Sequence, residues 1–539
     1  MAESCALQAL DSLCGEIRHR LKERTSKEGI DSILDQFQVT AYDFAWIQSQ
    51  TQAVLALSEA TERLGSETEP LSSLFQAVVL HEVIGRVSGR EKEFGLSRGF
   101  VNELLDKTGS QKWLEENLSP DKHSLLAKTL VESQKTPYGL TEEQEMIRET
   151  FRRFAESTVM PMAEKVHRQD LRVPSEVLSG LRELGCFGLS IPQKYGGFQD
   201  DQKVDHTAMV IATEELSRAS LGIAGSLVTR PEILSKALLK GGTEEQKKKW
   251  LPQIASGEKM VAVAVTEPDF GSDVAGIKVS AQRHGGVWKI NGTKTWCTFA
   301  GRADLLMVLA RTDPDFSKKH RGLSILIAEK PPFEGHEFEH RQPSGGRVAG
   351  SAIATIGYRG MHSYEVVFED YEVPYENLVG GEAGLGRGFY LQMEGFAGGR
   401  LQTAARAVGV MQAAYEKALS YSLERKVFNQ PIFNYGLTQF KLARMATLIQ
   451  ASRQFTYKAA RLMDQGKGQI EASMVKFFAS KVAEWVAREA QQIHGGMGYA
   501  EEYAVSRYFV DARVFSIFEG AEEILALKVI ARNLLESPL

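Results

Sequence analysis

The sequence predicts a mainly helical α+β protein in which one β domain is flanked by helical domains. Apolar residues recur at helical spacing up to about residue 135 and again after Pro374. Between these regions the period changes, because Val261, Val263 and Val265 alternate with smaller residues as in a strand. The 539 residues also exceed what one hydrophobic core usually organises, so two to four packed units are expected.

Composition and charge narrow the class of protein. Hydrophobic residues make up 43% and charged residues 25%, which is ordinary globular usage and predicts a folded chain. The formal net charge is −5, whereas proteins that hold phosphate backbones usually carry a basic excess. We therefore expect no nucleic-acid partner.

Targeting and redox signals are weak. The four cysteines, Cys5, Cys14, Cys186 and Cys297, have no short paired spacing, so neither a disulfide framework nor a metal site is expected. No run approaches the roughly 20 apolar residues of a membrane span. The first helical stretch carries Asp11 and Glu16, unlike a signal peptide. These observations predict a cytoplasmic protein with no membrane partner.

Residues 1–135 form the first predicted domain, an N-terminal helical extension. Its first apolar positions, Leu7, Leu10, Cys14, Ile17 and Leu21, share one helix face. The region has no Gly-rich loop, His/Cys cluster or paired acidic motif, so we assign it packing and no chemistry.

A second helical domain is predicted over residues 140–260. It opens with a Thr followed three residues later by Gln, Thr141 and Gln144, which is a capping-box pattern. The same pattern recurs at Thr243 and Gln246. Each pair marks the start of a helix.

The β domain is predicted over residues 261–375. Gly285-Gly286 indicates a turn between two strands, and Asn291-Gly292 is a strong hairpin signal. Residues 343–351, which are Gly-rich and include Arg347, suggest an inserted loop. Helical periodicity returns after Pro374, so residues 376–539 are predicted to form a C-terminal helical bundle.

Two motifs in the β domain could carry chemistry. Val265 and Thr266 end a strand, and Ser272 follows in a Gly-containing loop that could expose N–H groups to a phosphate or an acceptor-rich ring. A surface turn would have the same sequence. Trp296 and Thr298 lie two apart on a strand and would share a face, where they could cover a planar cofactor or form part of the core.

Two further motifs lie near the C-terminus. Gln492 ends a helix just before closely spaced glycines, including Gly495 and Gly496, which is more than a simple cap needs and favours a nearby ligand. Glu519 stands beside apolar residues and Gly520, between two helical stretches. A buried carboxyl group has a raised pKa, as a base for a weakly acidic carbon requires, but exposed helix-end glutamates are commoner.

Together these motifs resemble the acyl-CoA dehydrogenase family, in the family's order and over roughly residues 140–536. The resemblance implies a helical domain, a middle β-barrel-like domain and a C-terminal four-helix bundle, preceded here by the extra helical domain. It also implies FAD between the middle domain and the bundle, an acyl-CoA substrate, electron-transferring flavoprotein as acceptor, and a homodimer or homotetramer whose subunits share the flavin site.

The resemblance assigns a role to each motif residue. Glu519 matches the catalytic base, and Gly520 beside it belongs to the substrate site, as do Ser272 and Arg400 on the CoA side. Arg425 and Phe428 match an Arg-x-x-Phe motif that reaches a neighbouring subunit's cofactor. The other residues assigned to FAD are Val265, Thr266, Trp296, Thr298, Gln492, Gly495 and Gly496.

Some positions depart from the family pattern, and other features indicate one branch of the family. Gly436 and Ala521 replace a Gln and a Thr that are frequent in the family, and Gly399 occupies the position of an alternative base. The long N-terminal domain and the sequence of residues 356–362 are similar to a branch that oxidises a branched dicarboxylic monothioester. Arg230 would then pair with the distal carboxylate, although an arginine that reaches solvent or pairs with Glu232 or Asp269 fits the sequence equally well.

Rival functions remain open within the superfamily. A short- or branched-chain acyl-CoA dehydrogenase and an acyl-CoA oxidase share the site residues. A DNA-associated alkylation-response flavoprotein has a similar length, but the acidic residues near the C-terminus, such as Glu522 and Glu523, argue against DNA binding.

Overall fold

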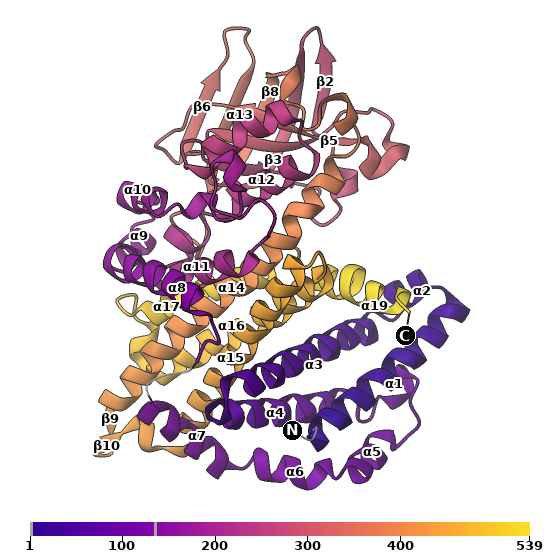
Figure 1. Cartoon of the computed structure of the whole chain (residues 1–539), viewed down its shortest axis with the longest axis vertical. Coiled ribbons are helices and arrows are strands. Elements are labelled where there is room, and N and C mark those ends of the chain that lie inside the picture. Colours follow the sequence, from indigo (N-terminus) through magenta and orange to yellow (C-terminus); the bar gives the residue numbers. More distant parts are fainter. Residues whose placement is uncertain (1–3, 134–136, 539) are drawn as a thin grey trace. The chain divides into compact units, whose positions relative to one another are not determined.

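The computed structural model describes residues 4–133 and 137–538 and comprises two compact units (Figure 1). Residues 1–146 and 403–539 form the first, which we call the helical unit. Residues 147–402 form the second, the central unit, which contains the sheet. The fold class is confirmed: the chain is mostly helical, with one larger sheet in its middle and extra helices at its N-terminus. The end of the first predicted domain, residue 135, lies outside the described residues.

The helical unit combines helices from both ends of the chain. The N-terminal ones are α1 (Cys5–Glu28), α2 (Ile30–Gln36), α3 (Gln38–Leu64), α4 (Glu69–Val87), α5 (Phe100–Thr108), α6 (Ser110–Asn117) and α7 (Pro120–Ser133). The C-terminal ones are the second half of α14 (Gly388–Glu424), α15 (Gly436–Asp464), α16 (Gln469–Ile493), α17 (Ala504–Arg513), α18 (Glu522–Ile524) and α19 (Arg532–Glu536).

The N-terminal helices pack on the C-terminal ones through α3 and α4, which contact α15, while α3 also contacts α16 (Figure 1). Trp46 of α3 lies against Phe477 and Phe478 of α16, with ring centroids 5.2 and 5.8 Å apart, and Phe75 of α4 meets Phe478 at 5.9 Å. Aromatic pairs at these separations add to the burial energy. The N-terminal extension is therefore part of the core of this unit.

The helices of the central unit are α8 (Glu142–Phe154, which starts in the helical unit), α9 (Met160–Arg168), α10 (Ser175–Glu183), α11 (His206–Ala219), α12 (Thr229–Gly241) and α13 (Glu244–Ala255). Two of them, α8 and α13, begin where the sequence predicts. Both capping boxes are present: Thr141 and Gln144 exchange bonds of 3.1 and 3.3 Å, and Thr243 and Gln246 exchange bonds of 3.0 and 3.2 Å. Each box satisfies two N–H groups that a helix start leaves unpaired.

One eight-stranded sheet forms the β domain. Its strands are β1 (Val261–Ala264), β2 (Ser280–His284), β3 (Val287–Thr298), β4 (Leu305–Arg311), β5 (Leu323–Glu329), β6 (Glu337–Arg341), β7 (Arg347–Ile353) and β8 (Ser363–Pro374). They lie in the order β1-β4-β2-β3-β8-β7-β6, with β5 beside β4. Among the described strands of this sheet, the pairs β1–β4 and β2–β4 are parallel, and the other pairs are antiparallel.

Two sequence predictions about this sheet are wrong. Asn291-Gly292 is not a hairpin turn: it lies inside β3, where the register against β8 shifts and Gly292 takes a φ of 124°. The turn is the Gly285-Gly286 pair between β2 and β3. Residues 343–351 are not an inserted loop either, because β7 begins at Arg347 and pairs with both β6 and β8.

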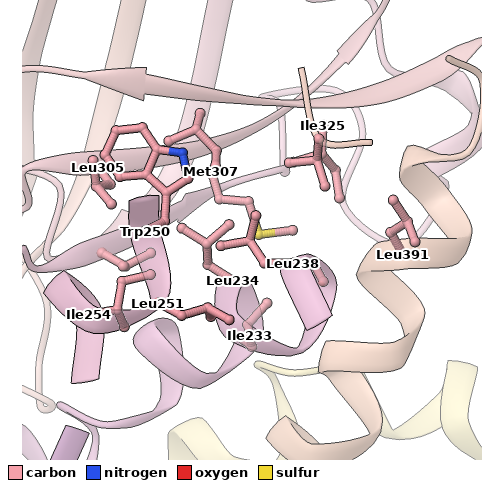
Figure 2. Close-up of a cluster of buried hydrophobic side chains, with 14 of the residues drawn as sticks. Ile233, Leu234, Leu238, Trp250, Leu251, Ile254, Leu305, Met307, Ile325 and Leu391 are labelled. Carbon is pink, nitrogen blue, oxygen red and sulfur yellow. The ribbon is translucent and has the colours of Figure 1, made fainter. Parts of the chain in front are cut away.

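The core of the central unit lies between α12, α13 and the strands β4 and β5 (Figure 2). Leu234 and Leu238 of α12 and Trp250 of α13 point toward Leu305 and Met307 of β4, and all five are at most 1% exposed. Burial of this apolar area, at roughly 25 cal/mol per Å², fixes α12 against the strands. Arg230, in the first turn of α12, is positioned by this packing.

No helix within residues 4–133 and 137–538 is long and apolar enough to cross a membrane.

Candidate active site

Some of the residues predicted from sequence to form the site lie in the central unit and the others in the helical unit. In the central unit, Val265 and Thr266 follow β1. The side chain of Lys294, on β3, holds the backbone at Val265 in place. The Lys294 ammonium is fully buried and donates to the Val265 carbonyl and to Glu267 Oε1, both at 2.8 Å. Burial lowers the pKa of Lys294 to about 8, against the opposing effect of Glu267.

Glu267 connects this ion pair to a third segment. Its carboxylate also accepts the backbone N–H groups of Lys278 and Val279, at 2.7 and 2.9 Å. The Thr266 carbonyl accepts the Thr295 N–H at 2.8 Å. The loop that carries Val265 and Thr266 is thereby tied to β3 and to residues 278–279. Ser272 lies between these ties and is exposed.

Trp296 and Thr298 lie at a β-bulge in β3. The register against β8 shifts between Lys294 and Cys297, and Trp296 has a φ of 57°. The regular alternation that would have put both side chains on one face is therefore broken, so that argument from sequence was wrong. The Trp296 side chain is 55% exposed, whereas Thr298 is buried with its hydroxyl 2.9 Å from Ser363 Oγ. A large exposed indole above a bulge is a surface that a flat ligand can cover.

Arg230 is buried, with 7% of its surface exposed. Its Nη1 donates to the Ser226 carbonyl at 3.2 Å and to the Tyr358 hydroxyl at 3.0 Å. Within residues 4–133 and 137–538 no ion pair joins it to Glu232, Asp269 or another carboxylate. The alternative of an arginine that reaches solvent is wrong, and the guanidinium has only neutral partners. Arg400, on α14, is partly buried.

In the helical unit, Glu519 and Gly520 form a tight turn between a 3₁₀ segment, Val514–Ser516, and α18. Both have positive φ, 55° and 102°, and for a glutamate this is a strained conformation that its surroundings must maintain. The ammonium of Lys476, fully buried in α16, donates to the Gly520 carbonyl at 2.6 Å. Lys476 therefore holds the turn that presents Glu519.

A second buried cation faces the Glu519 side chain. Arg406 of α14 is fully buried, and its Nη2 lies 3.9 Å from Glu519 Oε1, whose side chain is 9% exposed. Arg406 also donates to Thr403 Oγ1 at 2.6 Å and lies 4.7 Å from the centroid of the Phe518 ring. These contacts fix the guanidinium, so it can orient the carboxylate by attraction.

Arg425 and Phe428 lie on an exposed β-hairpin formed by β9 (Lys426–Val427) and β10 (Gln430–Pro431). Phe428 and Asn429 both have positive φ, 48° and 66°, as a two-residue type I′ turn requires. Phe428 is 91% exposed at the tip. An aromatic ring held rigidly in solvent indicates a surface that a ligand or another chain covers.

Gln492, Gly495 and Gly496 lie at the exposed end of α16 and the 3₁₀ turn that follows it. Gly495 has a φ of 58°, and a Cβ at Gly495 or Gly496 would meet no atom within 4 Å. The open space on both glycines lets a ligand approach the backbone. His494 is buried, stacks on Tyr421 at 4.3 Å and has its Nδ1 2.8 Å from the Ala490 carbonyl, so it is a structural residue.

Family models for the acyl-CoA dehydrogenase N-terminal, middle and C-terminal domains match residues 141–258, 262–371 and 386–535. The chain belongs to the acyl-CoA dehydrogenase family. Members of this family are FAD-dependent oxidoreductases, and this acyl-CoA dehydrogenase is an enzyme of that class.

Three relatives show how far the similarity extends. The chain is 37% identical to (2S)-methylsuccinyl-CoA dehydrogenase of Cereibacter sphaeroides, over 99% of this chain and 97% of that one. It is 36% identical to a subunit of the caffeyl-CoA reductase–Etf complex of Acetobacterium woodii, over 71% and 96%. Butyryl-CoA dehydrogenase from Megasphaera elsdenii superposes with a TM-score of 0.67 at 34% identity, over 74% and 99%.

The structure adds four residues that the sequence did not assign to the site of this acyl-CoA dehydrogenase. Lys294, Lys476, Arg406 and Tyr358 each contact or support a predicted site residue. A buried cation leaves only a weak sequence signal, namely a Lys or Arg inside an apolar helix or strand, and its partner cannot be read from spacing.

Removal of the Lys294 ammonium tests how much this ion pair stabilises the loop that carries Val265 and Thr266. Lys294→Met should lower the free energy of unfolding by about 3–5 kcal/mol, because the Glu267 carboxylate stays buried without its counter-charge. Urea unfolding followed by tryptophan fluorescence measures this loss. The double variant Lys294→Met/Glu267→Gln should recover part of it. A double variant as unstable as the sum of the single ones would show that the pair is not coupled.

Proposed function

We propose that this enzyme oxidises (2S)-methylsuccinyl-CoA to mesaconyl-CoA, with FAD as its cofactor. The observation that carries the proposal is the buried Arg230, whose guanidinium has only neutral hydrogen-bond partners in the part of the chain described. The match to a methylsuccinyl-CoA dehydrogenase over 99% of the chain, N-terminal helices included, supports the same substrate.

Arg230 suits the distal carboxylate of a dicarboxylic acyl group. Burying a cation without a counter-charge is costly, and a carboxylate ligand removes that cost while offering a charge-assisted bond. The Tyr358 hydroxyl, 3.0 Å from Nη1, orients the guanidinium and is close enough to Arg230 to join the same carboxylate. A plain fatty acyl chain would leave the charge unpaired. The surroundings of Arg230 thus favour a substrate with a second acid group.

Glu519 is the base in this proposal. It takes the proton from the carbon next to the thioester carbonyl, while Arg406 fixes its side chain and Lys476 its backbone turn. The shielded side chain excludes water from the proton path. Ser272, Arg400 and Gly520 are assigned to the CoA and thioester part of the substrate. FAD, when bound, supplies the hydride acceptor at the β-carbon.

The residues present fit FAD. Exposed Trp296 offers a flat apolar surface, and Val265 and Thr266 lie together on the loop after β1. Thr266 and Thr298 each carry a hydroxyl group. Arg425, Gln492 and the two open glycines offer a cation, an amide and bare backbone to phosphates and adenosine.

The hairpin with Arg425 and Phe428 supports a shared site in a homodimer or homotetramer. Phe428 at its tip and Arg425 just before its first strand are both exposed in the single chain. Electron-transferring flavoprotein is the proposed acceptor, since a relative with 36% identity is a subunit of a reductase–Etf complex.

Replacing Glu519 separates proton removal from binding. Glu519→Gln should keep the yellow colour and bind the substrate, yet lose kcat by roughly 10²–10⁴-fold or more, because the amide cannot accept the α-proton. Anaerobic stopped-flow absorbance records flavin bleaching. Glu523→Gln, an exposed neighbour, is the matched control and should bleach normally. Bleaching of Glu519→Gln at the wild-type rate would remove Glu519 from the proton path.

Arg425 should link cofactor binding to assembly. Arg425→Ala should lower FAD occupancy and weaken the oligomer together, because a charge-assisted contact to phosphate is lost at the subunit boundary. Flavin-to-protein absorbance ratios and solution scattering measure the two effects. The exposed neighbour Lys426 supplies the control variant Lys426→Ala. A wild-type protein that is a fully loaded monomer would contradict the shared site.

Arg230 should determine acyl specificity. Arg230→Met should reduce kcat/KM on methylsuccinyl-CoA by on the order of 2–5 kcal/mol, the cost of stranding a buried charge, and change it little on an uncharged branched acyl-CoA of similar length. Tyr358→Phe should cause a smaller loss in the same direction. The exposed Arg283→Met is the control. Equal losses on both substrates would exclude a carboxylate partner for Arg230.

A further inference from the structure

Three side chains that sequence spacing does not connect meet in the central unit: Asp170, His336 and His362. Their potential ligand atoms all lie within 4.8 Å of one another. Asp170 follows α9, His336 lies between β5 and β6, and His362 immediately precedes β8. The imidazole rings of the two histidines are 4.5 Å apart between centroids. The absence of paired cysteines predicted no metal site, but this cluster contains no cysteine.

The hydrogen bonds of His362 leave its second nitrogen facing an anion. Nδ1 lies 3.2 Å from the Gly360 carbonyl, which can only accept, so Nδ1 carries a hydrogen. Nε2 lies 3.2 Å from Asp170 Oδ1. Nε2 is therefore the nitrogen that can offer a lone pair to a cation, and Asp170 Oδ1 lies beside it. A cation bound at this point would have both atoms as ligands.

This arrangement is the one that metal-binding histidines adopt. In such sites the nitrogen that does not bind the metal commonly donates to a backbone carbonyl, which fixes the ring and the tautomer. Asp170 and His362 also have φ values of 51° and 45°, conformations that cost energy in non-glycine residues. Both strained positions aim their side chains at the same point.

Nearby cations leave the Asp170 carboxylate available. Arg359 Nε lies 3.6 Å from Asp170 Oδ1, beyond hydrogen-bond length, and the same guanidinium donates to the carbonyls of Thr355 and His167 at 3.0 Å each. Arg172 and Arg302 pair with Glu334, at 3.2 and 3.1 Å. Their charges are therefore offset by a different carboxylate.

The cluster is open to solvent on one side. Asp170 and His336 line a cavity of about 570 Å³, and His336 is exposed. An ion can reach the site through this cavity, and a water molecule or a small ligand can occupy the coordination position that three protein ligands leave free.

We propose that Asp170, His336 and His362 bind one divalent transition-metal ion of the zinc class. Two imidazoles and a carboxylate suit zinc, cobalt or ferrous ions, whereas magnesium and calcium prefer oxygen ligands alone. The ion would tie the start of β8 to the segment after α9. Ser363, next to His362, is the residue whose hydroxyl meets Thr298. The site is independent of which acyl-CoA the enzyme oxidises.

Zinc titration of the intact, flavin-loaded protein tests the proposal. After treatment with a chelator and its removal, isothermal titration with ZnCl2 should show one equivalent bound, and elemental analysis should recover that equivalent after gel filtration. Zinc should raise the thermal unfolding midpoint. Co²⁺ should give absorption bands above 520 nm, where oxidised flavin absorbs little.

Variants identify the ligands. His336→Ala should weaken zinc binding by at least roughly 10–100-fold, since even second-sphere changes cost that much. The His336 side chain is exposed, so its removal leaves the core intact, and the flavin spectrum checks that the variant is folded. Asp170→Asn should weaken binding similarly. His284→Ala, an exposed histidine on β2, is the matched control and should bind as the wild type does. No zinc bound at 100 times the protein concentration, or equal binding by His336→Ala and His284→Ala, would overturn the proposal.

Discussion

The buried ion pair between Lys294 and Glu267 is the contact on which the central unit's half of the site depends. One ammonium and one carboxylate join three segments: the loop after β1, the middle of β3 and residues 278–279. Burial works against the charge of Lys294, so the pair persists because every polar atom has a partner. If some of these polar atoms lacked hydrogen-bond partners, the pair would be less stable than an apolar core in the same place. The pair therefore fixes the geometry more strictly than apolar packing could.

Much of the fold could be predicted from the sequence because its signals are local. Helical and strand periods, and both capping boxes, depend on residues a few positions apart, and the structure contains them where expected. The failures arose where a distant partner overrides a local signal. Asn291-Gly292 favours a turn, but pairing with β8 keeps it inside a strand as a bulge. Residues 343–351 favour a loop because they are Gly-rich, but from Arg347 onward the chain forms β7 because it pairs with β6 and β8 on either side.

For the candidate site, too, local motifs could be predicted from the sequence and distant partners could not. Motif residues such as Glu519 and Trp296 could be proposed from the sequence because each motif is a short stretch of neighbouring residues. Their supports could not, since Lys476 lies 44 positions from Gly520 and Tyr358 lies 128 from Arg230. Asp170, His336 and His362 are joined only by the folded backbone. Sequence therefore located the groups assigned to substrate and cofactor, and the structure was needed to find what holds them in place.

The division of the helical unit between the two chain ends affects how the protein is made. The aromatic surface of α3 and α4 is synthesised long before its partners on α15 and α16. At about 5–20 residues per second, the roughly 400 residues between Phe75 and Phe477 require roughly 20–80 s. Throughout this time Trp46 and Phe75 lack the rings that cover them. This unit cannot close before its C-terminal helices are made, and the nascent N-terminal helices are a natural substrate for chaperones that bind exposed apolar surface.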